Sequence, residues 1–138
     1  PDSAPSTAQK TVLVVDDEQV IRLFVRRALE MNCYRVIEAE SAAAAERVAA
    51  TIAAGTERID LLICDLVLPG VNGLDFCQVL RQDPDTASIP ILIITGHPSR
   101  EDVRRAIDLH VNGFLVKPFD SKSLAEKAVQ VLRQNGKQ

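Results

Sequence analysis

The stretch TVLVV, residues 11–15, is followed at once by Asp16 and Asp17, and this pattern decides how the rest of the chain is interpreted. Three later apolar runs also end at polar residues: residues 61–64 before Asp65, 91–94 before Thr95, and 114–116 before Lys117 and Pro118. Strands that are apolar on both faces are typical of a parallel sheet covered by helices on both sides. Ligands of such sheets bind at the carboxyl ends of the strands. The four runs therefore predict one site that contains carboxylates, a hydroxyl and an amine.

Helical patterns separate these runs, and residues 35–39 supply one further strand. Apolar residues recur at steps of three and four, which predicts one buried face on each helix. The predicted faces comprise Val20, Ile21, Phe24, Val25, Ala28 and Leu29; then Leu74, Cys77, Val79 and Leu80; then Val103, Ala106 and Ile107; and finally Leu124, Ala128, Val131 and Leu132. A further, alanine-rich helix is expected from Ser41 to Ala54, with Gly55 as its stop. Ser99 and Asp102 predict a capping box, and Asp120 or Ser121 is expected to cap the last helix.

The regular alternation of strand and helix predicts an α/β domain with right-handed crossovers. Because the chain contains five predicted strands, the flavodoxin-like doubly wound order 2-1-3-4-5 is favoured, with five helices around the sheet. In this order the first and third strands are neighbours at the switch point. Asp16, Asp17 and Asp65 are therefore predicted to face the crevice where a ligand binds.

The composition fits one domain, expected at residues 11–134, because the chain has 138 residues and 46% hydrophobic composition. Residues 1–10 are expected to be a disordered lead-in and residues 135–138 a polar tail. A net charge of −3 without long runs of like charge argues against direct contact with nucleic acid or an anionic membrane. No apolar run approaches the ~18 residues of a membrane span. The three cysteines lack metal-ligand spacing and are expected to be reduced packing residues of a cytoplasmic protein.

Clustered carboxylates need compensation, since two like charges about 4 Å apart repel by about 4 kcal/mol at an effective dielectric near about 20. An all-oxygen ligand set favours Mg²⁺, or alternatively Mn²⁺, over zinc. Lys117 then offers a positive charge and Thr95 a hydroxyl to a phosphate, opposite a carboxylate that could act as a nucleophile. The pattern predicts phosphoryl transfer onto an aspartate side chain.

Each of these residues also has a simpler interpretation. Asp16 and Asp17 could cap the first helix, and Asp65 could cap a loop. Thr95 could be an ordinary strand residue, and most lysines, like Lys117 here, are solvated at a surface. Their joint occurrence at strand ends favours the site.

Four segments together resemble the receiver domain of response regulators, and the resemblance covers nearly everything from Thr11 to Gln134. They are VVDDE at residues 14–18, DLVLPG at 65–70 followed by Asn72-Gly73, Thr95-Gly96, and KPF at 117–119. None is specific alone, but their order and spacing are.

The resemblance implies that Asp65 accepts a phosphoryl group from a phosphohistidine on a histidine kinase or a histidine phosphotransfer protein. Asp17 would be the main acidic ligand of Mg²⁺, and Asp16 would reach the ion partly through water. Asp65 and the backbone carbonyl of Val67 would complete the protein ligands. The domain would catalyse its own phosphorylation and dephosphorylation without being a metabolic enzyme.

The resemblance also implies a switch. Thr95 would hydrogen-bond the phosphoryl oxygen and Lys117 would pair with it, with the Lys117–Pro118 bond in the cis form. Phe114 would follow Thr95 inward. That movement would reshape a surface formed by the fourth predicted helix, the fifth predicted strand and the fifth predicted helix, which an unknown downstream protein or a second copy of the chain could bind.

Other interpretations remain open at this stage. A receiver-like scaffold could bind partners without phosphorylation. A phosphohydrolase usually needs a second acid-base carboxylate two residues after its nucleophile, where this chain has Val67, and a flavin or nucleotide carrier would need a Gly-rich loop after the first strand. His97 could influence the hydrolytic water or be an ordinary loop residue. The sequence does not separate a stand-alone receiver from one excised from a longer regulator or hybrid kinase.

Overall fold

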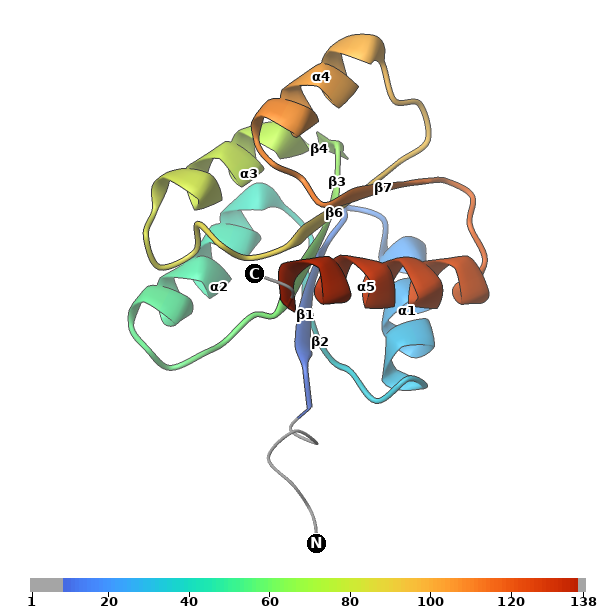
Figure 1. Ribbon diagram of the computed structural model, residues 1–138, viewed down its shortest axis with the longest axis horizontal. Coiled ribbons are helices and arrows are strands. Elements are labelled where there is room, and N and C mark those ends of the chain that lie inside the picture. Colours follow the sequence, from blue (N-terminus) through green and yellow to red (C-terminus); the bar gives the residue numbers. More distant parts are fainter. Residues whose placement is uncertain (1–8, 137–138) are drawn as a thin grey trace, which may run out of the picture.

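A computed structural model describes residues 9–136, and a five-stranded parallel sheet forms its centre (Figure 1). The strands are β1 (Thr11–Val15), β2 (Arg35–Ala39), β3 (Leu61–Asp65), β6 (Ile91–Thr95) and β7 (Gly113–Val116). Their spatial order, β2-β1-β3-β6-β7, is equivalent to the predicted order 2-1-3-4-5, so the predicted fold class is confirmed. The sequence did not predict the short antiparallel hairpin of β4 (Val67–Leu68) and β5 (Val71–Asn72).

Five helices flank the sheet: α1 (Gln19–Glu30), α2 (Ala42–Ala53), α3 (Gly73–Gln82), α4 (Arg100–Asp108) and α5 (Ser121–Gly136). Figure 1 shows α2, α3 and α4 on one side of the strands and α1 and α5 on the other. Most of the predicted lead-in and the last two residues of the predicted tail lie outside the described residues. No helix within residues 9–136 is long and apolar enough to cross a membrane.

Strand alternation divides the core into two clusters, one on each face of the sheet. Leu13, Leu62 and Ile93 face the cluster that includes α2, α3 and α4. Val14 and Ile63 belong to the opposite cluster, which is completed by α1 and α5. Because β1, β3 and β6 are buried at every position, their sequences lack the polar alternation of half-exposed strands.

The helix starts are encoded locally. The side chain of Ser41 accepts a hydrogen bond from the backbone N–H of Ala44, and Ser99 forms the predicted capping box with Asp102. Asp120, rather than Ser121, caps α5, because its carboxylate accepts a hydrogen bond from the N–H of Ser123. These caps satisfy N–H groups that have no partner within the helix.

The predicted buried faces of the helices were partly wrong. Val20 is 77% exposed and Ile107 66% exposed, and Phe24, Val79 and Val103 are exposed as well. In α4 only Ala106 is buried. At about 100° per residue, Val103 and Ile107 lie on the same flank of Ala106. A helix that presents Ala106 to the sheet therefore turns both of the larger residues outward.

Candidate functional site

Side-chain alternation places Asp16, Asp65 and Lys117 on the same side of the sheet. Asp16 and Asp65 each lie two residues after a strand residue of the α1/α5 cluster, and Lys117 follows Leu115, which packs against that cluster. The ammonium nitrogen of Lys117 lies 2.9 Å from a carboxylate oxygen of Asp16 and 2.9 Å from one of Asp65. The structure thus brings together three residues that are separated by up to 101 positions in the sequence.

A third carboxylate completes the acidic cluster. Carboxylate oxygens of Asp16, Asp17 and Asp65 all lie within 4.8 Å of one another. Asp16 and Asp65 are buried, whereas Asp17 is exposed. This donor set consists of oxygen atoms alone and is partly open to solvent, which fits Mg²⁺ because that ion keeps several waters in its shell.

Burial and charge shift the proton affinities in this cluster. Burial raises the pKa of Asp16 above its ordinary value, and the nearby Asp65 carboxylate acts in the same direction; hydrogen bonds from Glu18 and Lys117 only partly oppose them. Burial by itself would lower the pKa of Lys117, but its bonds to Asp16 and Asp65 outweigh burial and raise it. The carboxylates of Asp16 and Asp65 therefore share one ammonium group, and Asp17 adds further negative charge beside them.

The peptide bond between Lys117 and Pro118 is cis, as the resemblance implied. The backbone N–H of Lys117 donates to the carbonyl of Thr95 at 2.8 Å, so the residue remains joined to β6 after β7 has ended. Its side chain is only 16% exposed. The alternative of a solvated surface lysine is therefore wrong, since the amine is enclosed between two acidic side chains.

The start of α3 approaches the backbone of Asp65 very closely. A Cβ atom at Gly73 would lie 2.1 Å from the carbonyl oxygen of Asp65, nearer than real Cβ contacts allow. The N–H of Gly73 also donates to the carbonyl of Leu66 at 2.6 Å. Only glycine permits this approach, which fixes the strand end that carries Asp65.

Val67 follows Asp65 in the hairpin above the sheet. Its backbone N–H donates to the Asp65 carboxylate at 3.2 Å, and its side chain points away from the core, with the residue 73% exposed. The described contacts do not place the carbonyl of Val67 among the acidic oxygens, so its expected role as a metal ligand stays a prediction.

Thr95 differs from the other candidate residues because it lies on the opposite face of the sheet. It follows Ile91 and Ile93, which face the α2/α3/α4 cluster, and Phe114 is paired with Ile93 and packs against the same cluster. The buried hydroxyl of Thr95 accepts a hydrogen bond from the N–H of His97 at 3.3 Å. Thr95 and Phe114 thus share a face, whereas their movement together stays a prediction.

Two charged residues around the site were not singled out from the sequence, and the packing role of Gly73 was not predicted. Arg22 and Glu38 form an ion pair beside Asp16, and Gly73 packs on Asp65. A signal existed for Glu38, a charged residue at an interior position of β2, whose other charged residue, Arg35, lies at the strand's start. Arg22 gave none, because an arginine on an amphipathic helix is ordinary.

The fold and the charged crevice at the carboxyl edge of the sheet define a flavodoxin-like α/β protein of the chemotaxis-regulator type. The solved structure of the chemotaxis response regulator CheY4 of Vibrio cholerae is similar, with a TM-score of 0.79 and 29% identity, covering 90% of this chain and 99% of that one. The model of the response regulator receiver domain family matches residues 12–129. The chain belongs to this family, whose members are signalling domains of two-component systems and not metabolic enzymes.

Curated relatives agree with this assignment. The phosphate regulon transcriptional regulatory protein PhoB of Pseudomonas aeruginosa is 32% identical over 127 residues, covering 92% of this chain and 53% of that protein. The KDP operon transcriptional regulatory protein KdpE of Escherichia coli is 35% identical over 124 residues, covering 90% of this chain and 52% of that protein. The chain therefore spans about half the length of the curated relatives it matches.

Proposed function

We propose that this receiver domain is switched by Mg²⁺-dependent transfer of a phosphoryl group from a phosphohistidine onto Asp65. The observation that carries the proposal is the joint position of Asp16, Asp65 and Lys117, with the ammonium nitrogen 2.9 Å from both carboxylates. Asp17 adds an exposed carboxylate on the open side of the same cluster. A purely structural ion pair would not need this excess of negative charge.

In the proposed reaction a carboxylate oxygen of Asp65 attacks the phosphorus atom of the donor. An oxygen–phosphorus bond forms as the nitrogen–phosphorus bond breaks, and the donor's imidazole leaves with the electron pair. Mg²⁺, held by Asp16, Asp17, Asp65 and the carbonyl of Val67, would neutralise charge on the phosphoryl oxygens. Lys117 would exchange its bond to the Asp65 oxygen for a bond to a phosphoryl oxygen.

The switch would depend on Thr95. Its hydroxyl accepts from the N–H of His97, so its own hydrogen is free to be donated to the phosphoryl group once the side chain turns toward Asp65. Phe114 is half-buried on the same face and could occupy space that Thr95 vacates. The surface of α4, β7 and α5 would then change, and an unidentified downstream protein or a second copy of the chain would sense it.

A protein donor is supported by an apolar surface next to the site. Val20, Phe24, Pro118 and Phe119 line a groove of about 400 Å³ that also reaches Lys117. The rings of Phe24 and Phe119 are 6.0 Å apart. Exposed apolar surface of this kind marks protein contacts, so we place the histidine kinase or phosphotransfer protein there. The three free cysteines support a cytoplasmic location for this exchange.

The test is incubation with acetyl phosphate, with and without Mg²⁺, followed by intact-mass measurement and mapping of the modified residue. We expect a Mg²⁺-dependent gain of one phosphoryl group on Asp65, absent in Asp65→Asn and retained in the matched control Asp108→Asn, whose carboxylate is exposed on α4. A phosphohistidine donor is the follow-up if the small donor is too slow. No labelling from either donor would refute the proposal and favour a phosphorylation-independent scaffold.

A further inference from the structure

Arg22 is a largely buried cation beside the acidic cluster, and within residues 9–136 it forms no hydrogen bond or ion pair with the carboxylates of that cluster. Its side chain is only 14% exposed. One guanidinium nitrogen, Nη1, donates to the backbone carbonyl of Asp16 at 2.7 Å, and Nε donates to the carboxylate of Glu38 at 3.0 Å. Arg22 therefore joins three elements: helix α1, the edge strand β2 and the loop that carries Asp16 and Asp17.

The carbonyl of Asp16 belongs to the same rigid peptide plane as the N–H of Asp17. A bond that holds this plane limits the ψ angle of Asp16 and the φ angle of Asp17, and so sets the direction of the Cα–Cβ bond of Asp17. Within residues 9–136 the Asp17 carboxylate accepts no hydrogen bond and forms no ion pair. Its direction depends on the backbone that Arg22 holds.

The guanidinium is itself held in place. Glu38 accepts from Arg22 through one carboxylate oxygen and from Arg26 through the other. Burial alone would raise the pKa of Glu38, but the hydrogen bonds from Arg26 and Arg22 outweigh it and lower the pKa, so Glu38 stays ionised as their partner. Arg26 shares this carboxylate and also pairs with Glu30, yet it does not reach Asp16.

We propose that Arg22 is a positioning residue for the metal site, acting through the Asp16–Asp17 peptide, with Glu38 as its anchor. The inference rests on the proposed function in one respect, that the ligand of the site is Mg²⁺. Groups behind metal ligands commonly change metal affinity by about 10–100-fold when they are replaced.

The sign of the effect separates positioning from simple electrostatics. A cation near a cation site repels the ion, so Coulomb's law alone predicts tighter Mg²⁺ binding when Arg22 loses its charge. Positioning predicts the opposite, weaker binding, because the Asp17 carboxylate is no longer directed toward Asp16 and Asp65.

The experiment measures Mg²⁺ dissociation constants by calorimetry for the wild type, Arg22→Met, Arg22→Lys and the matched control Arg26→Met. We expect binding about tenfold weaker in Arg22→Met, an intermediate value in Arg22→Lys, and a change below about twofold in Arg26→Met. Hydrogen exchange of the Asp17 amide, measured without metal, should be faster in Arg22→Met than in Arg26→Met.

Equal or tighter Mg²⁺ binding by a folded Arg22→Met would overturn the inference. If that variant does not fold, Arg22→Lys decides, and wild-type affinity with wild-type amide exchange would then count against a positioning role. If the wild type itself binds no Mg²⁺, the proposed function fails, and the positioning role stands or falls on the exchange of the Asp17 amide.

Discussion

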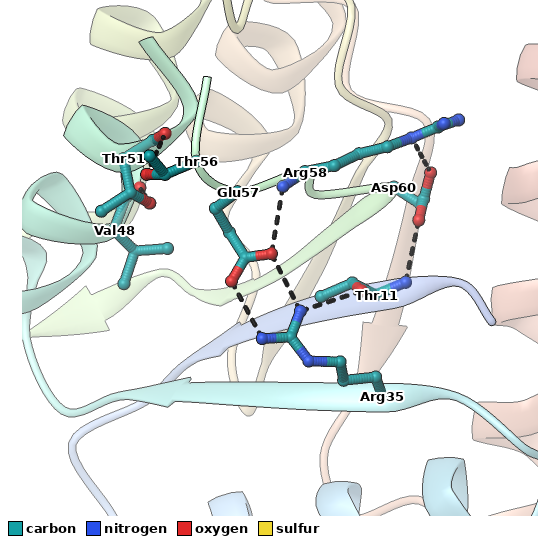
Figure 2. A network of polar contacts seen from close by, with 8 residues as sticks. All are labelled: Thr11, Arg35, Val48, Thr51, Thr56, Glu57, Arg58 and Asp60. Carbon is teal, nitrogen blue, oxygen red and sulfur yellow. Dashed lines mark hydrogen bonds and ion pairs between the residues drawn. The ribbon is translucent and has the colours of Figure 1, made fainter. Parts of the chain in front are cut away.

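The strands of the parallel sheet begin at one end, here called the amino edge, and finish at the other, the carboxyl edge. The two edges differ in how their charges are arranged. At the amino edge, where β1, β2 and β3 begin, two arginines meet two carboxylates (Figure 2). Arg35 binds Glu57 through two bonds of 2.9 Å, and Arg58 binds Asp60 at 3.0 Å. At the carboxyl edge, the ammonium group of Lys117 pairs with two buried carboxylates, Asp16 and Asp65, and the exposed carboxylate of Asp17 lies beside them.

The difference separates stability from function. In this network each arginine pairs with a carboxylate, and Asp60 also accepts the N–H of Thr11, so the network ties the first strand to the start of β3. Charge is balanced there and leaves nothing for a ligand to neutralise. The carboxyl edge has the same chemical groups in unequal number, and an excess of buried negative charge is what a cation or a phosphate–cation pair can compensate.

Removing Lys117 should give the largest difference in stability between the two edges. In Lys117→Ala the carboxylates of Asp16 and Asp65 lose the one cation that pairs with them among the described residues, and leaving a buried charge unpaired costs about 3 kcal/mol or more in free energy of unfolding. Arg35→Ala at the amino edge should change stability far less, because the Arg35 side chain is 48% exposed and water can solvate the Glu57 carboxylate that it leaves. Urea unfolding without metal measures both variants; a larger loss for Arg35→Ala would contradict the comparison.

Mg²⁺ should stabilise the wild type by a comparable amount. An ion that binds only the folded chain adds about 2.7 kcal/mol at about 100 times its dissociation constant. Asp17→Asn should remove most of this gain, whereas Asp60→Asn should keep it although it weakens the amino edge. The melting temperatures of the wild type and of each variant are measured with Mg²⁺ and with a chelator, which gives four values for each comparison of a variant with the wild type.

Gly73→Ala should disturb the carboxyl edge through packing rather than charge. The new methyl group would lie 2.1 Å from the carbonyl of Asp65, and overpacking of this kind costs about 2 kcal/mol. Gly96→Ala is the matched control, since a Cβ there meets nothing within 4 Å. Denaturant midpoints compare the two, and equal stability would mean that α3 moves away without cost.

The smallest predicted effect is a difference in pH response. The pKa of Glu57 is lowered by Arg35, so its contribution to stability is present above its ordinary pKa of 4.5 and is lost as the pH falls through the lowered value. The pKa of Asp16 is raised by burial, so its contribution is present below its ordinary pKa of 3.8 and is lost as the pH rises through the raised value.

Lowering the pH should therefore reduce the contribution of Glu57 to stability at the amino edge and increase that of Asp16 at the carboxyl edge. A carboxyl ¹³C NMR titration of the metal-free protein should give a midpoint above 3.8 for Asp16 and below 4.5 for Glu57. Glu57→Gln should flatten the fall in stability on the acid side. A midpoint of Asp16 below its ordinary value would show that Lys117 outweighs burial.

The sequence predicted the sheet and the grouping of the main candidate residues for one physical reason. Parallel strands that are buried on both faces are recognisable as apolar runs, and their carboxyl ends meet at one edge, so Asp16, Asp65 and Lys117 could be brought together without a structure. Periodicity could not place Val20 or Ile107, because it identifies a helix face without showing where the sheet beneath that face ends.

Contacts between elements were beyond the sequence for a related reason. The bond from Arg22 to the carbonyl of Asp16 exists only after α1, β2 and the intervening loop have packed together. The close approach of Gly73 to Asp65 depends on the angle at which α3 leaves the hairpin. Neither arrangement leaves a repeated pattern along the chain.

The division of the core into two clusters has a consequence for how the domain exchanges signals. Helix α1, with the proposed donor surface, covers one face of the sheet, whereas α4 covers the other. A donor bound at α1 and a target that contacts only α4 would therefore occupy separate sides, whereas a target that also contacts α5 would share the donor's side. Under the proposed function, a target of the α4 type could stay bound while the donor transfers a new phosphoryl group.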